Sequence, residues 1–200
     1  MAIDPRARAA LQAQPGAAGI YYAGPAVVLR QTNGLVFPLT PAISYNQQVN
    51  WSPYDLVHTN YNYQTYRNTP SAAIQITGQF SNTTAEEHNY TVGVLHFLRS
   101  VTKMWYGANQ TSPAAGTPPP VLVFSAFGPQ VFNATKVVVA NFATTFDDNV
   151  DLVTGPSGNA LPAVMTLAID LMVTRNPKEQ KEQFTTSGFV SGSLYSRGFI

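Results

Sequence analysis

The 200-residue sequence contains no cysteine and very little charge. Without cysteine, the chain cannot build a disulfide framework, a zinc-thiolate site or a cysteine nucleophile. Charged residues make up 10% of the chain, whereas typical soluble domains contain about 25%. The formal net charge is +1. This balance excludes both a basic surface that grips nucleic acid non-specifically and the highly charged composition of disordered chains.

Aromatic residues are plentiful where charge is scarce. Phe, Tyr and Trp make up 12% of the chain and hydrophobic residues 44%. The cores of protein interfaces are depleted in charge and enriched in aromatic residues, so we expect a component of an oligomer. The length suits one domain with arms. Pro, Asn and Gln interrupt the uncharged stretches, and we therefore expect no membrane span.

Short alternating segments predict a chain made mostly of strands. We expect a strand over 26–30 and a hairpin turn at Asn33-Gly34, which leads into a strand at 35–37. In segment 60–66, Tyr61 and Tyr63 should face one side and Asn60, Asn62 and Gln64 the other. The remaining predicted strands are 49–54, 72–80, 121–127, 136–146 and 162–173. In the last of these, Thr166, Ala168 and Asp170 oppose an apolar face.

One strong helix is expected over 85–106. Thr84 and Glu87 form a capping-box pattern, and Gly107 is expected to end the helix. An apolar stripe at helical spacing should face the core: Tyr90, Val94, Phe97, Leu98, Val101, Met104 and Trp105. Six to eight strands around one helix indicate a mostly β or α+β fold.

Both ends of the chain differ from the middle. Residues 1–25 are rich in Ala, Gly and Gln, which is typical of an arm. We assign residues 26–175 to the central domain and residues 176–200 to a C-terminal arm, in which a charged connector precedes a Ser/Gly-rich tail. Four aromatic residues in this tail are spaced as separate anchors for an assembly partner: Phe184, Phe189, Tyr195 and Phe199.

No pattern of catalytic or metal-ligating residues emerges. Three histidines are present without a motif around them: His58, His88 and His96. Asp147, Asn149 and Asp151 resemble the start of a calcium loop, but Leu152 and Gly158 occupy positions that require Gly and Glu. Gly-x-Ser-x-Gly and phosphate-loop patterns are missing as well. We predict a protein that is not an enzyme and has no metal and no cofactor.

The best candidate for ligand binding is an aromatic cluster between residues 51 and 66. Its members are Trp51, Tyr54, Tyr61, Tyr63 and Tyr66. Flat aromatic faces flanked by Asn and Gln could stack on sugar rings, as in a carbohydrate-binding module. Alternating aromatic residues are also common in strands, where they pack against each other across the sheet. We favour cross-strand packing.

Three segments carry a resemblance to a known family: Trp51-Ser-Pro-Tyr-Asp-Leu-Val-His-Thr-Asn-Tyr-Asn-Tyr63, His96-Phe-Leu-Arg-Ser-Val-Thr-Lys-Met-Trp-Tyr-Gly107 and Gly116-Thr-Pro-Pro-Pro-Val-Leu-Val-Phe124. Together with Phe127-Gly128-Pro129 and Leu161-Pro162, they resemble the baseplate tail-tube junction proteins of contractile-tailed bacteriophages. The likeness covers roughly residues 35 to 175. The helix-end segment and the Pro-rich run are its most specific parts.

This resemblance implies a tail-tube fold, an antiparallel β-sandwich or barrel with one main helix outside and extended terminal arms. Six copies would form a ring in the virion, at the tail baseplate, after assembly in the host cytoplasm. One face of the ring would sit on the baseplate hub proteins, and the other would start polymerisation of the tail tube protein. Double-stranded DNA would pass through the channel without specific binding. The repeating tail tube subunit and a carbohydrate-binding module of a phage baseplate remain alternatives.

Two groups of residues follow as candidate surfaces. Candidate interface residues are Trp51, Tyr54, Tyr61 and Tyr63, together with the four aromatic residues of the C-terminal tail. The channel wall should be polar and uncharged, since a cationic wall would hold phosphate. The candidate lining is Gln75, Thr77 and Gln79, with the face of Asn60, Asn62 and Gln64 as the alternative.

Overall fold

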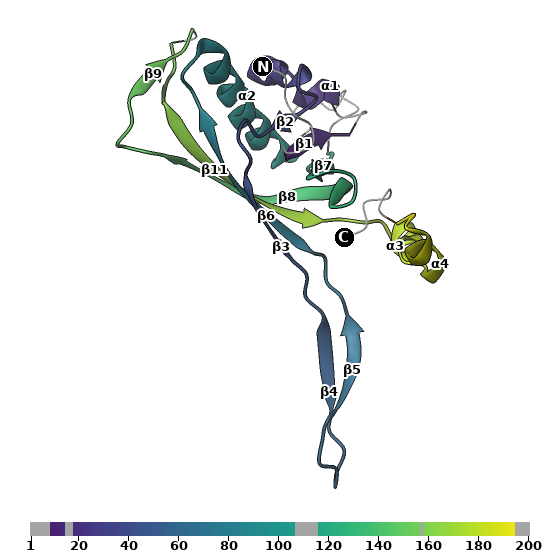
Figure 1. The fold of residues 1–200 in the computed structure, drawn as a ribbon. Helices are drawn as coiled ribbons and strands as arrows, with labels where there is room; N and C mark the ends of the chain where they lie inside the picture. The colour runs from purple at the N-terminus through teal and green to yellow at the C-terminus, as the bar shows by residue number, and fades with distance from the viewer. Residues whose placement is uncertain (1–8, 15–17, 107–115, 157, 195–200) are drawn as a thin grey trace.

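The computed structural model describes residues 9–14, 18–106, 116–156 and 158–194 (Figure 1). Seven strands form its main sheet: β1 (Ala10–Ala13), β2 (Leu35–Val36), β3 (Ala42–Asn46), β6 (Ala73–Ser81), β7 (Leu122–Ala126), β8 (Phe132–Phe146) and β11 (Val164–Val173). Their order is β2-β1-β7-β8-β11-β6-β3, and every neighbouring pair is antiparallel.

Two hairpins and five short or medium helices complete the described fold. The hairpins are β4 (Asn50–Tyr54) with β5 (Tyr63–Asn68) and β9 (Leu152–Thr154) with β10 (Ala160–Pro162). The helices are α1 (Ala18–Tyr21), the 3-10 helix η1 (Gly24–Arg30), α2 (Ala85–Val101), α3 (Pro177–Gln183) and α4 (Thr186–Ser191). The predicted mostly β fold with one main helix is confirmed.

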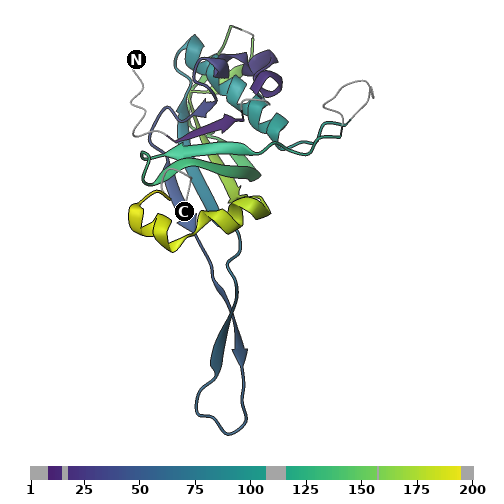
Figure 2. The same ribbon diagram turned by 90° about the vertical axis from the view of Figure 1, so that its right-hand side faces the viewer.

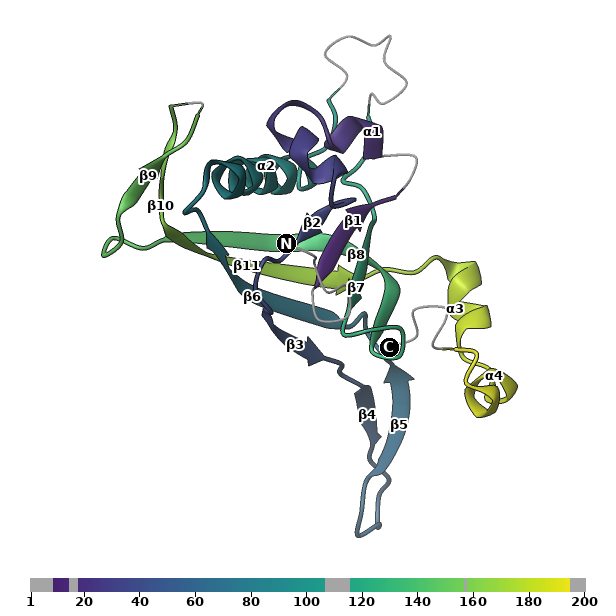
Figure 3. The same ribbon diagram turned by 45° about the horizontal axis from the view of Figure 1, so that its top comes forward.

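The seven strands form one continuous, curved sheet in place of the two separate sheets of a sandwich. β8 pairs with β7 on one side and β11 on the other, and its register shifts opposite Asp170 and Leu171. An irregularity of this kind bends a strand and increases its twist. Figure 3 shows β1 and β7 running at a steep angle to β6 and β11. The curvature brings Tyr45 of β3 within 6.2 Å of Phe132 at the start of β8, between ring centroids.

The core lies on the concave face of this sheet, under α2 and η1. β6 and β11 alternate between buried and exposed residues along their whole length, as their sequences predict. Above them, Val94, Phe97 and Leu98 of α2 are fully buried. Phe37 and Phe80 pack with their ring centroids 5.4 Å apart. Together these buried side chains form the core between the helices and the sheet.

The start of α2 is confirmed, and its predicted end is wrong. The Glu87 amide donates to Thr84 Oγ1 over 3.2 Å, and Glu87 Oε2 accepts from the Thr84 amide over 3.3 Å. The helix ends at Val101, because Thr102 leaves the helical conformation. The backbone of Trp105 instead pairs with Gly116 and Thr117. Gly107, the predicted stop, lies outside the described residues.

The predicted strand at 26–30 is wrong, because this segment forms η1. Pro25 lies in the first turn, where its fixed φ favours helical geometry. Periodicity could not separate the two, since a short apolar run suits a buried helix equally well. Asn33 and Gly34 do form a turn, with φ of 51° and 126°. However, β2 pairs with β1 and not with 26–30.

Part of the region predicted as an N-terminal arm belongs to the packed body. β1 lies between β2 and β7, and Leu11 is buried in the core. Tyr22 is buried as well, and its hydroxyl accepts a hydrogen bond from the Ala13 amide over 2.9 Å. The alternating pattern of β1 covers only four residues, which is too short to predict a strand within a segment of arm-like composition.

The β4–β5 hairpin projects far from the sheet (Figures 1 and 2). All its strand residues are exposed or half-buried. The C-terminal region forms α3 and α4 beyond the end of β11, with a capping box at Asn176 and Glu179. In the described parts of the chain, no helix has the length and hydropathy required to cross a membrane.

Candidate functional site

The face of the sheet opposite α2, here called the open face, carries the predicted channel-lining residues. Strand alternation buries Ile74, Ile76 and Phe80 and turns Gln75, Thr77 and Gln79 outward, where they are exposed. The neighbouring strands add matching rows by their register: Thr166, Ala168 and Asp170 from β11, Asn141, Ala143 and Thr145 from β8, and Ala42 and Ser44 from β3. In these rows the open face is made of small or polar side chains, and in the next row Met172 of β11, opposite Val138 of β8, adds an exposed apolar side chain.

Charge on the open face is sparse. Asp170 accepts a hydrogen bond from the Asn141 side-chain amide over 3.2 Å. Lys136 of β8 lies further along the same face and forms an ion pair with Glu179 of α3. This contact with Lys136 is the main cause that holds the pKa of Glu179 below its usual range. A phosphate approaching the rows around Thr77 would thus meet hydroxyl and amide groups and one carboxylate.

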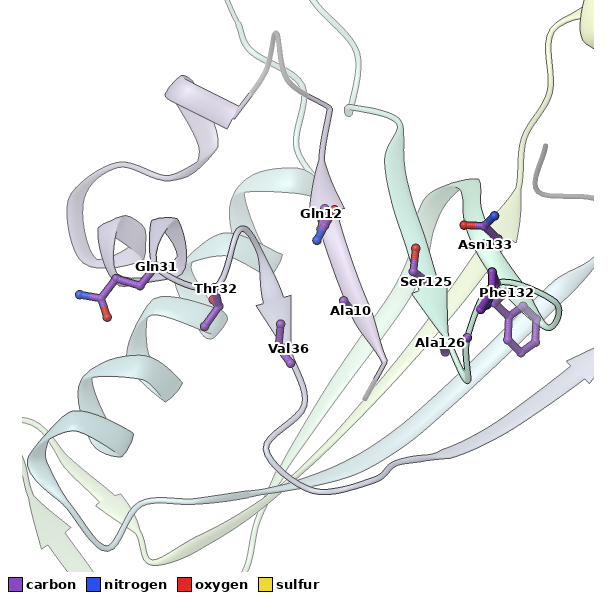
Figure 4. Close-up of a pocket in the computed structure, with 11 residues that line it drawn as sticks. Ala10, Gln12, Gln31, Thr32, Val36, Ser125, Ala126, Phe132 and Asn133 are labelled. Atoms are coloured by element: carbon purple, nitrogen blue, oxygen red, sulfur yellow. The ribbon is translucent and has the colours of Figure 1, made fainter. Parts of the chain in front are cut away.

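At the β1 end of the open face lies a hollow of about 520 Å³ (Figure 4). The register pairs Ala10 with both Val36 and Ser125, which places all three on the outer side of the strands. Figure 4 shows Gln12, Ser125 and Asn133 coming from three different strands at this hollow. Its lining contains no charged residue: Ala10, Gln12, Gln31, Thr32, Val36, Ser125, Ala126, Gly128, Pro129, Phe132 and Asn133. The low charge of the open face therefore continues to its end.

The predicted interface aromatics gather on the β4–β5 hairpin. Its aromatic side chains are each more than half exposed: Trp51, Tyr54, Tyr61, Tyr63 and Tyr66. Trp51 pairs with Tyr66 across the hairpin, with ring centroids 5.8 Å apart and planes at 78°. Tyr54 pairs with Tyr63. The cross-strand contact is confirmed for Trp51 and Tyr66.

Both faces of the hairpin carry aromatic residues. Trp51 and Tyr54 are three residues apart in an extended strand, so their side chains point to opposite sides. The predicted alternation over 60–66 is correct only from Tyr63 onward, because Asn60, Tyr61 and Asn62 precede β5 in the loop. These loop residues lie far from the open face (Figure 1). The alternative lining face of Asn60, Asn62 and Gln64 is therefore not part of the main sheet.

The tail aromatics differ in part from the predicted separate anchors. Phe184 and Phe189 contact each other, with ring centroids 6.2 Å apart, and both are exposed. Leu194 is buried near Gly188, where a Cβ would lie 3.0 Å from Leu194 Cδ2. The tail thus has a small packed centre of its own. Tyr195 and Phe199 lie outside the described residues.

The connector between sheet and tail carries a partly buried arginine, Arg175. Burial lowers the pKa of Arg175, and the nearby Tyr45 and Glu179 partly offset that effect. Burial also raises the pKa of the Tyr45 phenol. Arg175 follows β11 in the chain and lies near Tyr45 of β3 and Glu179 of α3.

The described residues do not build a metal-binding cluster. No group of three or more His, Asp or Glu side chains in these residues could hold a metal ion. His96 is exposed on α2, whereas His88 is fully buried at its first turn. The loop around Asn149 simply connects β8 to β9.

The hollow is not predictable from the sequence, because two of its lining residues, Ala10 and Gln12, lie on β1, inside the predicted arm. The signal was weak, since β1 offers only Leu11 and Ala13 as alternating core residues. Asp170 and its neighbours were recognisable, because the alternation of β11 already set them opposite the apolar face. No protein-family model and no curated protein matches the chain, so its function has to be inferred from the open face, the hairpin and the tail.

Proposed function

We propose that this chain is a structural virion protein of a contractile phage tail. Six copies form a ring on the baseplate hub, nucleate assembly of the tail tube and line the channel through which double-stranded DNA passes. The observation that carries the proposal is the open face: a broad, curved surface mostly of hydroxyl, amide and methyl groups, with one exposed methionine, Met172, and almost no charge. The resemblance of segments 51–63, 96–107 and 116–124 to tail-tube junction proteins supports the same assignment.

The chemistry of the open face suits a wall along which DNA slides. Lysine and arginine bind phosphate by releasing counterions, and such contacts would hold DNA in place. Rows through Gln75, Thr77 and Gln79 offer no cation, and the lysine further along is paired with Glu179. Asp170 repels phosphate. A wall of this kind stays hydrated and binds DNA weakly.

The edges and the hairpin support assembly with other chains. β2 and β3 are the edge strands of the sheet in the described chain. An exposed edge strand pairs readily with a strand of another chain, which promotes aggregation. In a ring, the edge strands of neighbouring subunits can pair with each other, so that they are no longer exposed. The β4–β5 hairpin has aromatic residues on both faces, and a two-stranded hairpin alone is only marginally stable in water. Contact with the hub proteins, the tube protein or a second copy would bury it.

The test is electron microscopy of the native assembly, isolated through an affinity tag on this chain. A single six-fold ring between a hub and a tube, with a continuous central channel, is the expected result. Rings repeated along the whole tube would identify the repeating tube subunit instead. A closed monomer or a three-fold spike inside the virion would contradict the ring.

The exposed hairpin aromatics favour one alternative, a carbohydrate-binding module of a baseplate. Stacking on sugars requires aromatic faces that remain accessible in the assembled particle. Glycan-array binding by the purified chain, abolished by Trp51→Ala, would support this alternative. Binding to no glycan, together with protection of Trp51 in the assembly, would favour the structural role.

A further inference from the structure

β8 continues well beyond the strand that pairs with it on one side. β7 begins at Leu122, opposite Val137, and covers β8 only from there back to Phe132. On its other side, β8 pairs with β11 as far as Phe146. Figure 3 shows β7 running away at a steep angle while β8 continues toward β9. One side of residues 138–146, here called the free β8 edge, therefore has no neighbouring strand in the described chain.

The free β8 edge lacks the usual protection of an exposed strand. Among the described residues, its backbone forms no hydrogen bond besides the pairing with β11. All its side chains are half-buried or exposed. Its sequence contains neither charge nor proline, which are among the devices that keep edge strands from pairing. Its Val, Thr and Phe residues favour strands. This edge is therefore suited to accept a strand of another chain.

β3 provides a second edge of the same kind. It pairs with β6 on one side, and no described strand lies on its other side. Its sequence also contains neither charge nor proline. Ile43, on its core-facing side, is only half-buried, and so are Val139 and Phe142 on the free β8 edge. A strand placed beside either edge would cover these apolar side chains.

β2, the third edge, is closed by a side chain of α2. The Phe37 amide donates to the Ala9 carbonyl. Strand alternation therefore turns the N–H and C=O of Val36 away from β1. The Tyr90 hydroxyl accepts a hydrogen bond from the Val36 amide over 2.8 Å and donates to the Val36 carbonyl over 3.1 Å. Tyr90 thus occupies the place that a further strand beside β2 would need.

We propose that copies of this chain join by pairing β3 of one subunit with the free β8 edge of the next, an inference that rests on the proposed ring and names its subunit contact. β3 and β8 are the outer strands of the unit β8-β11-β6-β3, in which every neighbouring pair is antiparallel. In a unit with an even number of strands, the two outer strands run in opposite directions. A rotation that repeats the unit therefore sets β3 antiparallel to β8 of the next copy.

This pairing continues both faces of the sheet across the contact. Ser44 of β3 and Ala143 of β8 lie on the open face, whereas Ile43 and Phe142 lie on the opposite face. With matching alternation, small and polar side chains stay on the open face and apolar side chains meet on the other. A slip by one residue would place polar side chains against apolar ones, so the register can change only in steps of two residues.

The absence of cysteine from the sequence makes a disulfide test of this contact specific. Ser44→Cys is combined in turn with Asn141→Cys, Ala143→Cys or Thr145→Cys, which lie on the open face at intervals of two residues. Within one subunit, two strands separate β3 from β8, so the paired Cα atoms are about 14 Å apart. A disulfide requires less than about 7 Å. Any disulfide must therefore join two copies.

The assembly is isolated through an affinity tag, oxidised and analysed by non-reducing electrophoresis. At least one of the three double variants should give a ladder of covalent oligomers that ends at six copies. The single-cysteine variants should remain monomeric. Ser44→Cys/Val36→Cys is the matched control for the β2 edge, and it should also remain monomeric, because Tyr90 closes that edge.

Three results would overturn the contact. Covalent dimers from Ser44→Cys alone would show that β3 pairs with β3. A ladder from the control with Val36→Cys would assign the contact to β2. A six-fold ring in electron microscopy without a disulfide from any of the three double variants would leave the proposed function standing and exclude this contact. By contrast, a ladder that continues beyond six copies would support the contact and contradict the ring.

Hydrogen exchange of the wild type gives the answer if the cysteine variants do not assemble. In the assembly, the amides of β3 that point away from β6 and the amides of 138–146 that point away from β11 should gain protection relative to the free subunit. Protection of Val36 should not change. Unchanged protection at β3 and at 138–146 would overturn the contact.

Discussion

At the scale of single residues, packing and helix propensity predict opposite effects of a Gly93→Ala substitution on stability. Gly93 lies inside α2, where a Cβ would stand 2.6 Å from Val28 Cγ2 and 2.9 Å from the Pro25 carbonyl oxygen. Propensity alone predicts that Gly93→Ala stabilises the helix by up to about 1 kcal/mol. The structure predicts the opposite, because η1 occupies the space that the methyl group needs.

We expect Gly93→Ala to lower the free energy of unfolding, since overpacking a filled site costs about 1 to 3 kcal/mol. Urea unfolding followed by circular dichroism measures the change. The double variant Val28→Ala/Gly93→Ala should lose less than the sum of the two single variants, because the smaller side chain removes one of the two close contacts. A stabilised Gly93→Ala protein would show that η1 does not pack on this face.

Glu87 gives a pH-dependent prediction at the same scale. Hydrogen bonds from the Thr83 hydroxyl, and then from Ser81 and the Thr84 and Thr83 amides, lower the pKa of Glu87. A lowered pKa means that the contribution to stability is complete above the unfolded value, about 4.3, and is lost as pH falls through the folded value. Glu87→Ala should therefore cost about 1 kcal/mol at pH 7, as loss of a cap does.

The measurement compares urea unfolding of wild type and Glu87→Ala at pH 7 and at pH 3. The difference between them should shrink at pH 3, where Glu87 gains a proton in the unfolded chain. Glu86→Ala is the matched control, since Glu86 is exposed. An equal difference at both pH values would argue against a charged carboxylate in the capping box.

At the scale of elements, features set by residues close together in the sequence can be predicted. Features set by contacts between distant segments cannot. The start of α2 follows from Thr84 and Glu87 alone, and the long alternation of β6 and β11 fixes their buried faces. By contrast, the segment at 26–30 suits a strand or a buried helix equally well until α2 covers it. The helix end at Val101 depends on the backbone pairing of Trp105 with Gly116 and Thr117, which no local signal announces.

The same division holds for the candidate surfaces. Gln75, Thr77 and Gln79 could be assigned to one face from alternation. Their neighbours could not be named, because cross-strand register depends on the partners β3, β8 and β11. The paired rings of Phe184 and Phe189 depend likewise on the turn between α3 and α4. Sequence therefore predicts which residues face outward better than which residues meet.

The C-terminal helices give an element-scale prediction. Their contacts include many within the tail itself: the Asn176 and Thr185 caps, the Phe184 and Phe189 rings, and Leu194 against Gly188. We expect truncation before residue 176 to leave the melting temperature of the subunit nearly unchanged and to abolish incorporation into the assembly.

Thermal melting by circular dichroism and particle isolation by affinity tag check these two outcomes. Glu179→Gln in the full chain is the control, because it weakens the ion pair to Lys136 and keeps the tail aromatics. This variant should still assemble. A truncated chain that melts much earlier, or that assembles normally, would rule out an assembly arm.

At the scale of the whole molecule, the low charge of the open face predicts how the proposed ring interacts with DNA. Gln75→Lys/Gln79→Lys should convert a wall that releases duplex DNA into one that holds it. Each added phosphate contact steepens the dependence of log affinity on log salt by about 0.9. Filter binding of duplex DNA by assembled rings at several salt concentrations measures this slope.

The hairpin loop offers the matched control. Asn60→Lys/Asn62→Lys adds the same charge far from the open face, on the projecting hairpin (Figure 1). This variant should leave DNA binding by the rings close to that of wild type. Tight, salt-dependent binding by wild-type rings, or an equal gain in both variants, would contradict the assignment of the open face to the channel.

The projecting segments also determine what the intrinsic fluorescence of this protein reports. The sequence contains two tryptophans. Trp51 lies on the β4–β5 hairpin and is 56% exposed, and Trp105 lies beyond the end of α2 and is 43% exposed. Neither belongs to the core. The emission maximum should therefore change little when the isolated subunit unfolds, whereas a blue shift should accompany the docking of a neighbour over these rings. We therefore expect tryptophan emission to report the proposed assembly and to respond little to the folding of the core.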